Sequence, residues 1–312
     1  LQRLSYVAGR IDVLPAGRLE LRAGLNHANL WGERPFLRID AEITRLDFRT
    51  SLGLGDGWEL ALDLEFYGRS GGFLDGFIFG FHDLFGVTQS RRDRFAENVL
   101  FVGRTPPSEL PNGEIEPQID ESDAGVGVGN PVVIVRKAII EPLNWRPALT
   151  LEVGLKLPVG SVDQSFATRG FDGLLALALR QPLGSWPLQL FLAGALVVSP
   201  GSEQIYGFEL REWQGTFLAG FEWRIDRTVS FVFHWLTQTG AASDRRYEPL
   251  PLSTHEFLGG FKWAPTGRDD WLLEVGFIQN SINDANTPDF GLHLSVRYQF
   301  DTDLFRRTTT DH

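Results

Sequence analysis

His293 and Ser295 are separated by one residue, a spacing that hydrolytic chemistry could use. A histidine can remove the proton of a neighbouring serine hydroxyl and so convert it into a nucleophile. This chemistry also needs a group that orients the base and donors that stabilise an oxyanion. The sequence shows no motif for either, and a two-residue match is a weak signal. We therefore expect no catalytic site.

Metal-binding and cysteine chemistry lack the residues that they need. The chain has 6 histidines and no cysteine. Without cysteine it forms no disulfide framework, no thiolate metal site and no cysteine nucleophile. The histidines form no set with metal-ligand spacing, so we expect no metal and no cofactor.

Charged side chains recur in the middle of segments that otherwise look like strands. Carboxylates and arginines that face each other across a narrow space attract each other and form ion pairs. We interpret these residues as the lining of an internal lumen or pore. The candidates are Arg22, Arg38, Asp40, Glu42, Asp63, Glu65, Glu152, Glu222, Glu256, Glu274 and Arg297.

The elements that carry these residues alternate with a period of two over segments of about ten residues, which is typical of β-strands. Between Phe290 and Phe300 every second residue is apolar, and Gly291, His293 and Arg297 lie between the apolar positions. Prolines fall at segment ends, where a missing N–H breaks no ladder. The pattern predicts strands near 18–28, 36–50, 57–67, 123–139, 147–157, 172–181, 187–198, 212–224, 228–238, 254–263, 270–279 and 289–300.

The two faces of these strands distinguish a membrane barrel from a soluble sandwich. One face is almost purely leucine, valine, phenylalanine and tryptophan, whereas the other carries charges in mid-strand. A transmembrane barrel accommodates both faces, because apolar side chains meet lipid and polar ones meet the lumen. Trp213 and Trp223 share one face of a strand and lie about 25 Å apart along the membrane normal, which matches the spacing of two aromatic girdles.

Composition agrees with this interpretation. The net charge is −11 over 312 residues, which argues against binding a phosphate backbone. Residues 181–202 are uncharged, but three prolines interrupt them, so we expect a strand with turns there and no membrane helix. The chain has no methionine, as a processed signal peptide would explain.

Connections alternate between short and long, so short turns should face the periplasm and long loops the outside. Counting strands from both ends shows that residues 68–122 leave and return on the extracellular side. They therefore contain zero or two spanning strands. Only one short candidate is present, Asn98–Gly103, so we assign none and the total is twelve. The fold prediction is an all-β, antiparallel up-and-down transmembrane barrel over residues 1–300, with a helical extracellular insertion at 68–122 and a periplasmic tail at 301–312.

The insertion contains a glycine- and phenylalanine-rich stretch, which we expect to form a helix over 72–86. Phenylalanines and glycines each recur every four residues, so the helix would carry an aromatic stripe and a smooth stripe that allows close packing. The helix would pack on the barrel rim, dip into the lumen as a lid or plug, or lie in the outer leaflet. The lid candidates are Gly72, Phe73, Asp75, Gly76, Phe77, Gly80, Phe81, His82 and Asp83.

Five segments also resemble a known family. They are Leu74–Ile78, Phe81–Gly86, Arg92-Asp93, Asp40–Glu42 and Ser122–Gly129. Together they resemble a bacterial outer-membrane barrel family known as domain of unknown function 3187. The resemblance implies a β-barrel in the bacterial outer membrane, and it implies no activity.

Partners follow from the expected location. Outer-membrane lipids and lipopolysaccharide would surround the barrel. The last strand, Leu292–Phe300, resembles the C-terminal signal that barrel-insertion machinery reads. Loops or the tail could meet another envelope protein, and no nucleic acid is expected.

The sequence leaves three function classes. The first is a narrow, partly plugged, porin-like channel for small solutes. The second is a structural or partner-binding barrel in an outer-membrane complex. The third, which the weak His-x-Ser signal supports least, is a lipid-modifying envelope enzyme.

Overall fold

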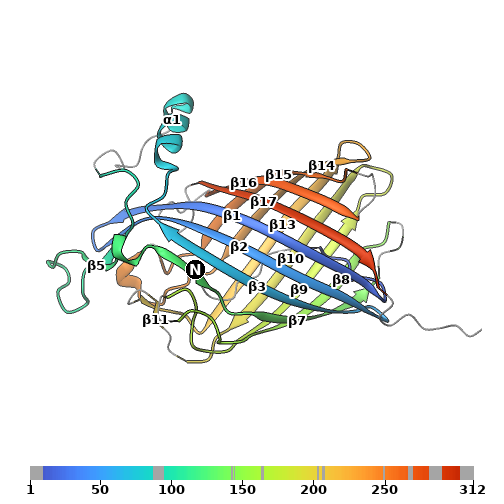
Figure 1. Cartoon of the computed structure of the whole chain (residues 1–312), viewed down its shortest axis with the longest axis horizontal. Coiled ribbons are helices and arrows are strands. Elements are labelled where there is room, and N and C mark those ends of the chain that lie inside the picture. Colours follow the sequence, from blue (N-terminus) through green and yellow to red (C-terminus); the bar gives the residue numbers. More distant parts are fainter. Residues whose placement is uncertain are drawn as a thin grey trace, which may run out of the picture.

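The computed structural model describes residues 10–86, 95–141, 143, 145–162, 165–201, 204–205, 208–248, 250–265, 270–280 and 290–302. Over these residues the chain forms a closed antiparallel barrel of twelve strands (Figure 1). The barrel strands are β1 (Arg18–Arg34), β2 (Leu37–Gly55), β3 (Trp58–Ser70), β7 (Val132–Ile140), β8 (Ala148–Lys156), β9 (Asp172–Pro182), β10 (Leu188–Val198), β13 (Trp213–Arg224), β14 (Val229–Gln238), β15 (Thr254–Trp263), β16 (Trp271–Asn280) and β17 (Phe290–Asp301).

The barrel closes between its first and last strands. β1 pairs with β17, so that Arg18 lies opposite Asp301 and Asn29 lies opposite Phe290. Every other barrel strand pairs with the next barrel strand along the chain, and β3 pairs directly with β7. Closure leaves no sheet edge exposed to lipid. The predicted twelve strands and their up-and-down order are confirmed.

The outer face is apolar because the period-two pattern turns every second side chain outward. Leu177 and Leu294 are each about half exposed, at 49% and 53%. Trp213 and Trp223 of β13 are similarly exposed and share this outer face. The exposed apolar side chains form the belt that a lipid-facing wall requires.

One end of the barrel carries the long connections and is therefore the extracellular end. There β1 and β2 reach farther than the other strands (Figure 1). The short β4 (Phe101–Arg104) pairs with the beginning of β2, and β5 (Glu116–Ile119) pairs with β4. β6 (Gly125–Val128) pairs with the end of β3. The described part of 68–122 therefore contains no spanning strand, as predicted.

The remaining small elements also belong to the extracellular connections. They are α1 (Asp75–Phe85), the 3-10 helices η2 (Glu121–Asp123) and η3 (Arg245–Tyr247), and the hairpin of β11 (Gln204–Ile205) and β12 (Phe208–Glu209). α1 projects away from the barrel wall, roughly perpendicular to the barrel axis (Figure 1). The helical part of the insertion is thus one short helix.

No helix in the described part of the chain is long and apolar enough to cross a membrane.

Candidate functional site

A cavity of about 900 Å³ lies inside the barrel, and all twelve barrel strands contribute to its lining. Side chains do not fill this lumen, unlike the interior of a typical eight-stranded barrel. Among the described lining residues, ten arginines and lysines face nine carboxylates. The lumen is therefore strongly polar and close to neutral overall.

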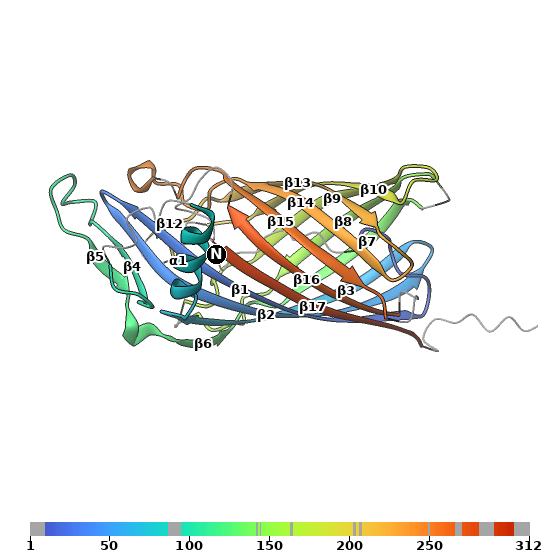
Figure 2. The same cartoon turned by 90° about the horizontal axis from the view of Figure 1, so that it is seen from above.

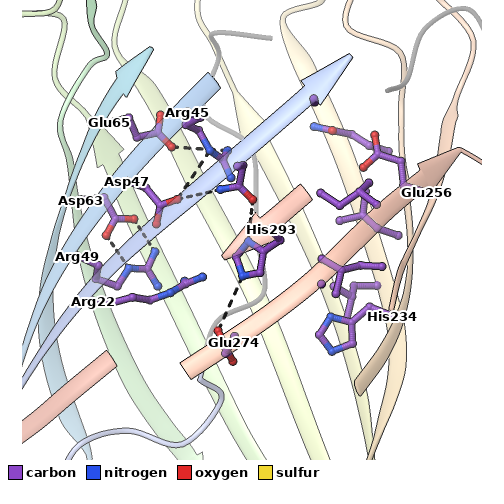
Figure 3. Close-up of a pocket in the computed structure, with 18 of the residues that line it drawn as sticks. Arg22, Arg45, Asp47, Arg49, Asp63, Glu65, His234, Glu256, Glu274 and His293 are labelled. Atoms are coloured by element: carbon purple, nitrogen blue, oxygen red, sulfur yellow. Dashed lines mark hydrogen bonds and ion pairs between the residues drawn. The ribbon is translucent and has the colours of Figure 1, made fainter. Parts of the chain in front are cut away.

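The charged residues concentrate on the wall formed by β1 to β3 and β15 to β17 (Figure 3). Arg49 of β2 makes two hydrogen bonds of 2.5 Å to the carboxylate of Asp63 on β3. Arg45 lies 3.8 Å from Glu65. Tyr67 donates a hydrogen bond of 2.6 Å to the same Glu65 carboxylate. Most charges on this wall are therefore neutralised by a neighbour on the same or the next strand.

A second polar cluster joins β13, β15, β16 and β17. Lys262 lies 3.1 Å from Glu222 and 3.7 Å from Glu274. Ser295 donates its hydroxyl to Glu274 at 2.7 Å, and the Nδ1 atom of His293 lies 2.8 Å from the side-chain oxygen of Asn26. The serine hydroxyl thus bonds to a carboxylate and not to the histidine, which gives this pair no hydrolytic geometry.

The opposite wall of the lumen is apolar. Its inward side chains come from β9, β10, β13 and β14 and include Ala176, Ala193, Phe191, Leu218 and Leu236. Inward alanines and leucines are unusual for a water-filled pore, whose lining is normally polar. The lumen therefore has two faces, one charged and one apolar.

Residues 10–14, which precede β1, lie inside the lumen near its periplasmic end. Arg136 of β7 is buried and donates hydrogen bonds to the backbone carbonyls of Arg10, Ile11 and Asp12. The same guanidinium bonds to Glu59 at 2.9 Å. One arginine therefore holds the segment from inside the barrel wall.

Further contacts fix both ends of the segment. Arg10 bonds to Glu59 at 2.8 Å and to Glu20 at 3.1 Å. The carboxylate of Asp12 pairs with Arg180 of β9 at 2.7 Å. The side chain of Ile11 is 7% exposed and belongs to the apolar cluster of the opposite wall. The segment crosses the lumen between the two walls and narrows it.

The position of residues 10–14 inside the lumen was not predicted from the sequence. Its partners, such as Glu59, Arg136 and Arg180, are far from it in the chain, so no local pattern connects them. The buried pair Arg136–Glu152, at 3.0 Å, belongs to the same network. The one available signal was that Glu59 and Arg136 sit near periplasmic strand ends on the inward face.

The extracellular end is spanned by a packed group of loops, here called the extracellular bridge. It joins Leu37 and Ala41 of β2 and Val102 of β4 to Phe208 and Tyr247, which come from connections on the far side of the barrel. Its members are Leu37, Ala41, Leu100, Val102, Ile119, Phe208 and Tyr247.

Tyr247 is the central residue of the extracellular bridge. Its hydroxyl donates to the backbone carbonyl of Thr105 at 2.7 Å and accepts a hydrogen bond of 2.9 Å from Arg104. Its ring meets that of Phe208 edge to face, with centroids 5.3 Å apart. The bridge narrows the lumen at the end opposite residues 10–14.

Helix α1 does not plug the lumen, so this alternative for the predicted lid is wrong. None of the described side chains of α1 lines the cavity, and the two views together place α1 outside the wall (Figures 1 and 2). A Cβ atom at Gly76 or Gly80 would meet nothing within 4 Å, so these two glycines of the stripe have no packing partner. Phe77 is 54% exposed and its ring lies 5.3 Å from that of Phe290 on the outer face of β17. Phe73 is also largely exposed, and so is Asp83.

A buried polar cluster fastens the base of α1 to the barrel. Glu42 accepts hydrogen bonds from the backbone N–H groups of Phe73 at 3.0 Å and Leu74 at 2.5 Å. Asp75 accepts from Asn29 at 3.1 Å. Gly72 has φ of +84°, and any Cβ there would collide with the Glu42 side chain. The side chains of Phe81 and His82, and residues 91–93, lie outside the described part of the chain.

The structure places eight predicted lumen residues along the cavity and three elsewhere. Arg38, Asp40 and Glu42 do not line it, which corrects the prediction for them. In the strand register Glu42 lies opposite Asn29. It is an even number of residues from Phe48, which faces outward, so both side chains leave β2 on the same face. On the extracellular extension of β2 that outward face is covered by the insertion and so tolerates charge. The eight predicted residues that do line the cavity are Arg22, Asp63, Glu65, Glu152, Glu222, Glu256, Glu274 and Arg297.

A closed twelve-stranded barrel with an apolar outer belt and a polar lumen defines an integral protein of the bacterial outer membrane. The chain belongs to the family described as Protein of unknown function (DUF3187), whose model matches residues 6–300. No curated protein matches the chain.

Solved outer-membrane barrels share the fold. The COG4313 outer membrane channel from Pseudomonas putida F1 is 12% identical with a TM-score of 0.62, and the match covers 95% of this chain and 100% of that one. The NanC porin is 10% identical with a TM-score of 0.48, covering 91% and 99%. The translocator domain of autotransporter NalP from Neisseria meningitidis is 9% identical with a TM-score of 0.47, covering 93% and 91%. The first similarity shows the fold, and the other two are too distant to carry an argument.

Proposed function

We propose that the protein is a narrow, porin-like channel for small solutes, constricted at both ends. The observation that carries this proposal is the cavity of about 900 Å³ that touches all twelve strands. Twelve strands lie between the eight whose interior side chains fill and the sixteen that leave an open aqueous channel. A lumen of this size passes small molecules only when the constrictions at its two ends open.

The two constrictions differ in construction. Residues 10–14 narrow the periplasmic end through hydrogen bonds and ion pairs to inward side chains such as Arg136. The extracellular bridge narrows the other end through apolar packing around Tyr247. The β4–β5 part of the insertion belongs to this bridge, so the lid function lies there and not in α1.

A structural or partner-binding barrel is the second candidate. The ion pairs across neighbouring strands, such as Arg49 with Asp63, favour it because they stiffen the wall. Single-channel recording in planar bilayers separates the two candidates. A channel shows discrete conductance steps under applied voltage. A barrel that stays silent, both as the native chain and after release of residues 10–14, contradicts the channel proposal.

A further inference from the structure

Arg22 lines the lumen without forming an ion pair to a described residue, and its charge acts on the Glu274 carboxylate only at longer range. It forms no hydrogen bond and no ion pair with any described residue, although its Nε atom is buried. Leaving a charged donor unsatisfied costs free energy, typically about 1–3 kcal/mol or more. The two Nη nitrogens of Arg22 are not among the buried atoms, so they are the donors that an anion entering the cavity would meet.

Two further arginines lie beside Arg22 on the neighbouring strands and add positive charge at the same height in the barrel. In the strand register Arg22 lies directly opposite Arg297 on β17 and Arg49 on β2. The carboxylate of Asp63 neutralises Arg49. The Nε atom of Arg297 is also buried without a hydrogen bond, and it lies 3.7 Å from Glu20.

Glu20 cannot neutralise all of these groups. Its carboxylate already accepts hydrogen bonds from Arg10 at 3.1 Å and from Gln299 at 2.5 Å. Over the whole described cavity lining, ten arginines and lysines face nine carboxylates, so one positive charge remains.

The apolar wall of the same cavity supplies the second half of a binding site. Phe191, Leu218, Val232 and Leu236 all line the cavity and turn inward from β10, β13 and β14. Such a surface gains by contact with an apolar ligand body, at about 25 cal/mol for each Å² removed from water. A volume of about 900 Å³ lies within the usual range of small-molecule pockets.

We infer that the lumen is a binding site for an amphiphilic organic anion. Its oxyanion group bonds to the guanidinium groups of Arg22 and Arg297, and its apolar body lies on the wall around Phe191 and Leu218. Paired guanidinium donors suit a carboxylate, which accepts two parallel hydrogen bonds. This inference deepens the proposed channel function by naming the class of solute, and it rests on that function for the route into the lumen.

A cationic ligand at Glu256 is the competing interpretation. Glu256 forms no hydrogen bond and no ion pair with a described residue, but Arg45 attracts its carboxylate and it has no buried polar atom left unsatisfied. Figure 3 shows it on the far side of the lumen from Arg22. Water can therefore satisfy Glu256, so this carboxylate does not require a cationic ligand.

Binding of 4-phenylbutyrate to the full chain in lipid nanodiscs tests the inference by isothermal titration calorimetry. Empty nanodiscs correct for partitioning into lipid. We expect saturable one-to-one binding of 4-phenylbutyrate, and much weaker binding of acetate and of 4-phenylbutylamine. Equal binding of the amine overturns the assignment of the anionic group, and equal binding of acetate overturns the role of the apolar wall. Absence of phenylbutyrate binding overturns the inference as a whole.

Variants locate the site. Arg22→Gln should weaken phenylbutyrate binding about tenfold or more, because a hydrogen bond to a charged group contributes about 1.5–3 kcal/mol. Arg227→Gln makes the same exchange in an exposed periplasmic turn and should leave binding unchanged. Leu236→Asn should weaken phenylbutyrate and leave acetate unaffected. Heat-modifiable migration of each variant on gels checks that the barrel has folded.

Conductance measured on the same preparations separates this inference from the proposed function. If phenylbutyrate binds but no conductance is seen, the binding site is supported and the channel function is contradicted. Conductance without phenylbutyrate binding retains the channel and contradicts the site.

Discussion

The constriction by residues 10–14 can be released without altering the barrel wall. Ile11 is the residue to change, because its side chain is 7% exposed and packs into the apolar cluster of the lumen. Its backbone carbonyl, which accepts from Arg136 at 3.0 Å and from Thr150 at 2.7 Å, stays in place in any substitution. Ile11→Asp therefore removes the apolar contribution alone and adds a charge.

The size of the effect follows from the burial. An isoleucine side chain that is almost fully buried contributes about 1.5–3 kcal/mol. An aspartate in its place would lie among the apolar side chains of that cluster, so desolvation of the carboxylate adds a further cost of at least ~1 kcal/mol. Since about 1.4 kcal/mol is a factor of ten, the ratio of docked to released segment should fall about 100-fold or more.

Two measurements check this prediction. Hydrogen–deuterium exchange reports release, because the Leu14 N–H is bonded to Glu59 at 2.8 Å in the docked segment. Single-channel recording reports the constriction. In Ile11→Asp we expect faster exchange over residues 10–14 together with larger conductance. Val13→Asp introduces the same charge at a partly exposed position that faces the cavity, and should keep the native exchange.

Either of two results would refute the reasoning. Unchanged exchange in Ile11→Asp would show that apolar burial does not hold the segment. Fast exchange with native conductance would show that the segment is not the constriction.

Three further predictions concern the wall, the extracellular bridge and α1. Leu294→Arg on the outer face should cost about 2–4 kcal/mol of folding free energy in lipid, whereas Leu258→Arg on the lumen face should cost much less. The side chain and the backbone N–H of Arg246 donate hydrogen bonds to Asp244 and hold the pKa of that carboxyl below its ordinary value of 3.8. The ionised carboxylate therefore stabilises η3 above that pH, and this stabilisation is lost as the pH falls through the lowered pKa. Acidification of the extracellular side below 3.8 should therefore raise open probability in bilayers. Deletion of 75–85 should leave conductance unchanged and reduce only thermal stability, because α1 lies outside the lumen.

Each of these has a control or a contrary outcome. Equal costs for the two arginine variants, in folding titrations into lipid vesicles, would contradict the assignment of faces. Asp244→Asn, which keeps a capping oxygen but loses the charge, should show increased opening at neutral pH and little added response to acid. Larger conductance after deletion of the helix would restore the plug interpretation of the insertion.

The strands could be predicted from the sequence because alternation is a local property of ten or so residues. The run from Phe290 to Phe300 shows its two faces without any knowledge of the fold, and the observed β17 covers it. The position of α1 also followed from local spacing. Its placement outside the wall did not, because glycines every four residues indicate a smooth surface without indicating what it contacts.

The candidate site was predicted only in part, since half of it depends on contacts between distant segments. Inward parity correctly located Asp63 and Glu274 on the cavity. Parity also contained the signal that was missed for Glu42, which is in step with the outward-facing Phe48. The network of Arg136 with residues 10–14 joins positions more than a hundred residues apart, and one sequence carries no record of such a pairing.

The docked segment also bears on how the barrel assembles. Residues 10–14 lead directly into β1. Apart from the bond of Arg10 to Glu20 at the seam where β1 meets β17, their hydrogen bonds go to β3, β7, β8 and β9. The first strand is consequently tethered to the rest of the barrel by a route that does not use the seam. If the seam opens during insertion, this internal tether would keep the first strand in register. Pairing of β1 with β17 and narrowing of the lumen by residues 10–14 would then occur together.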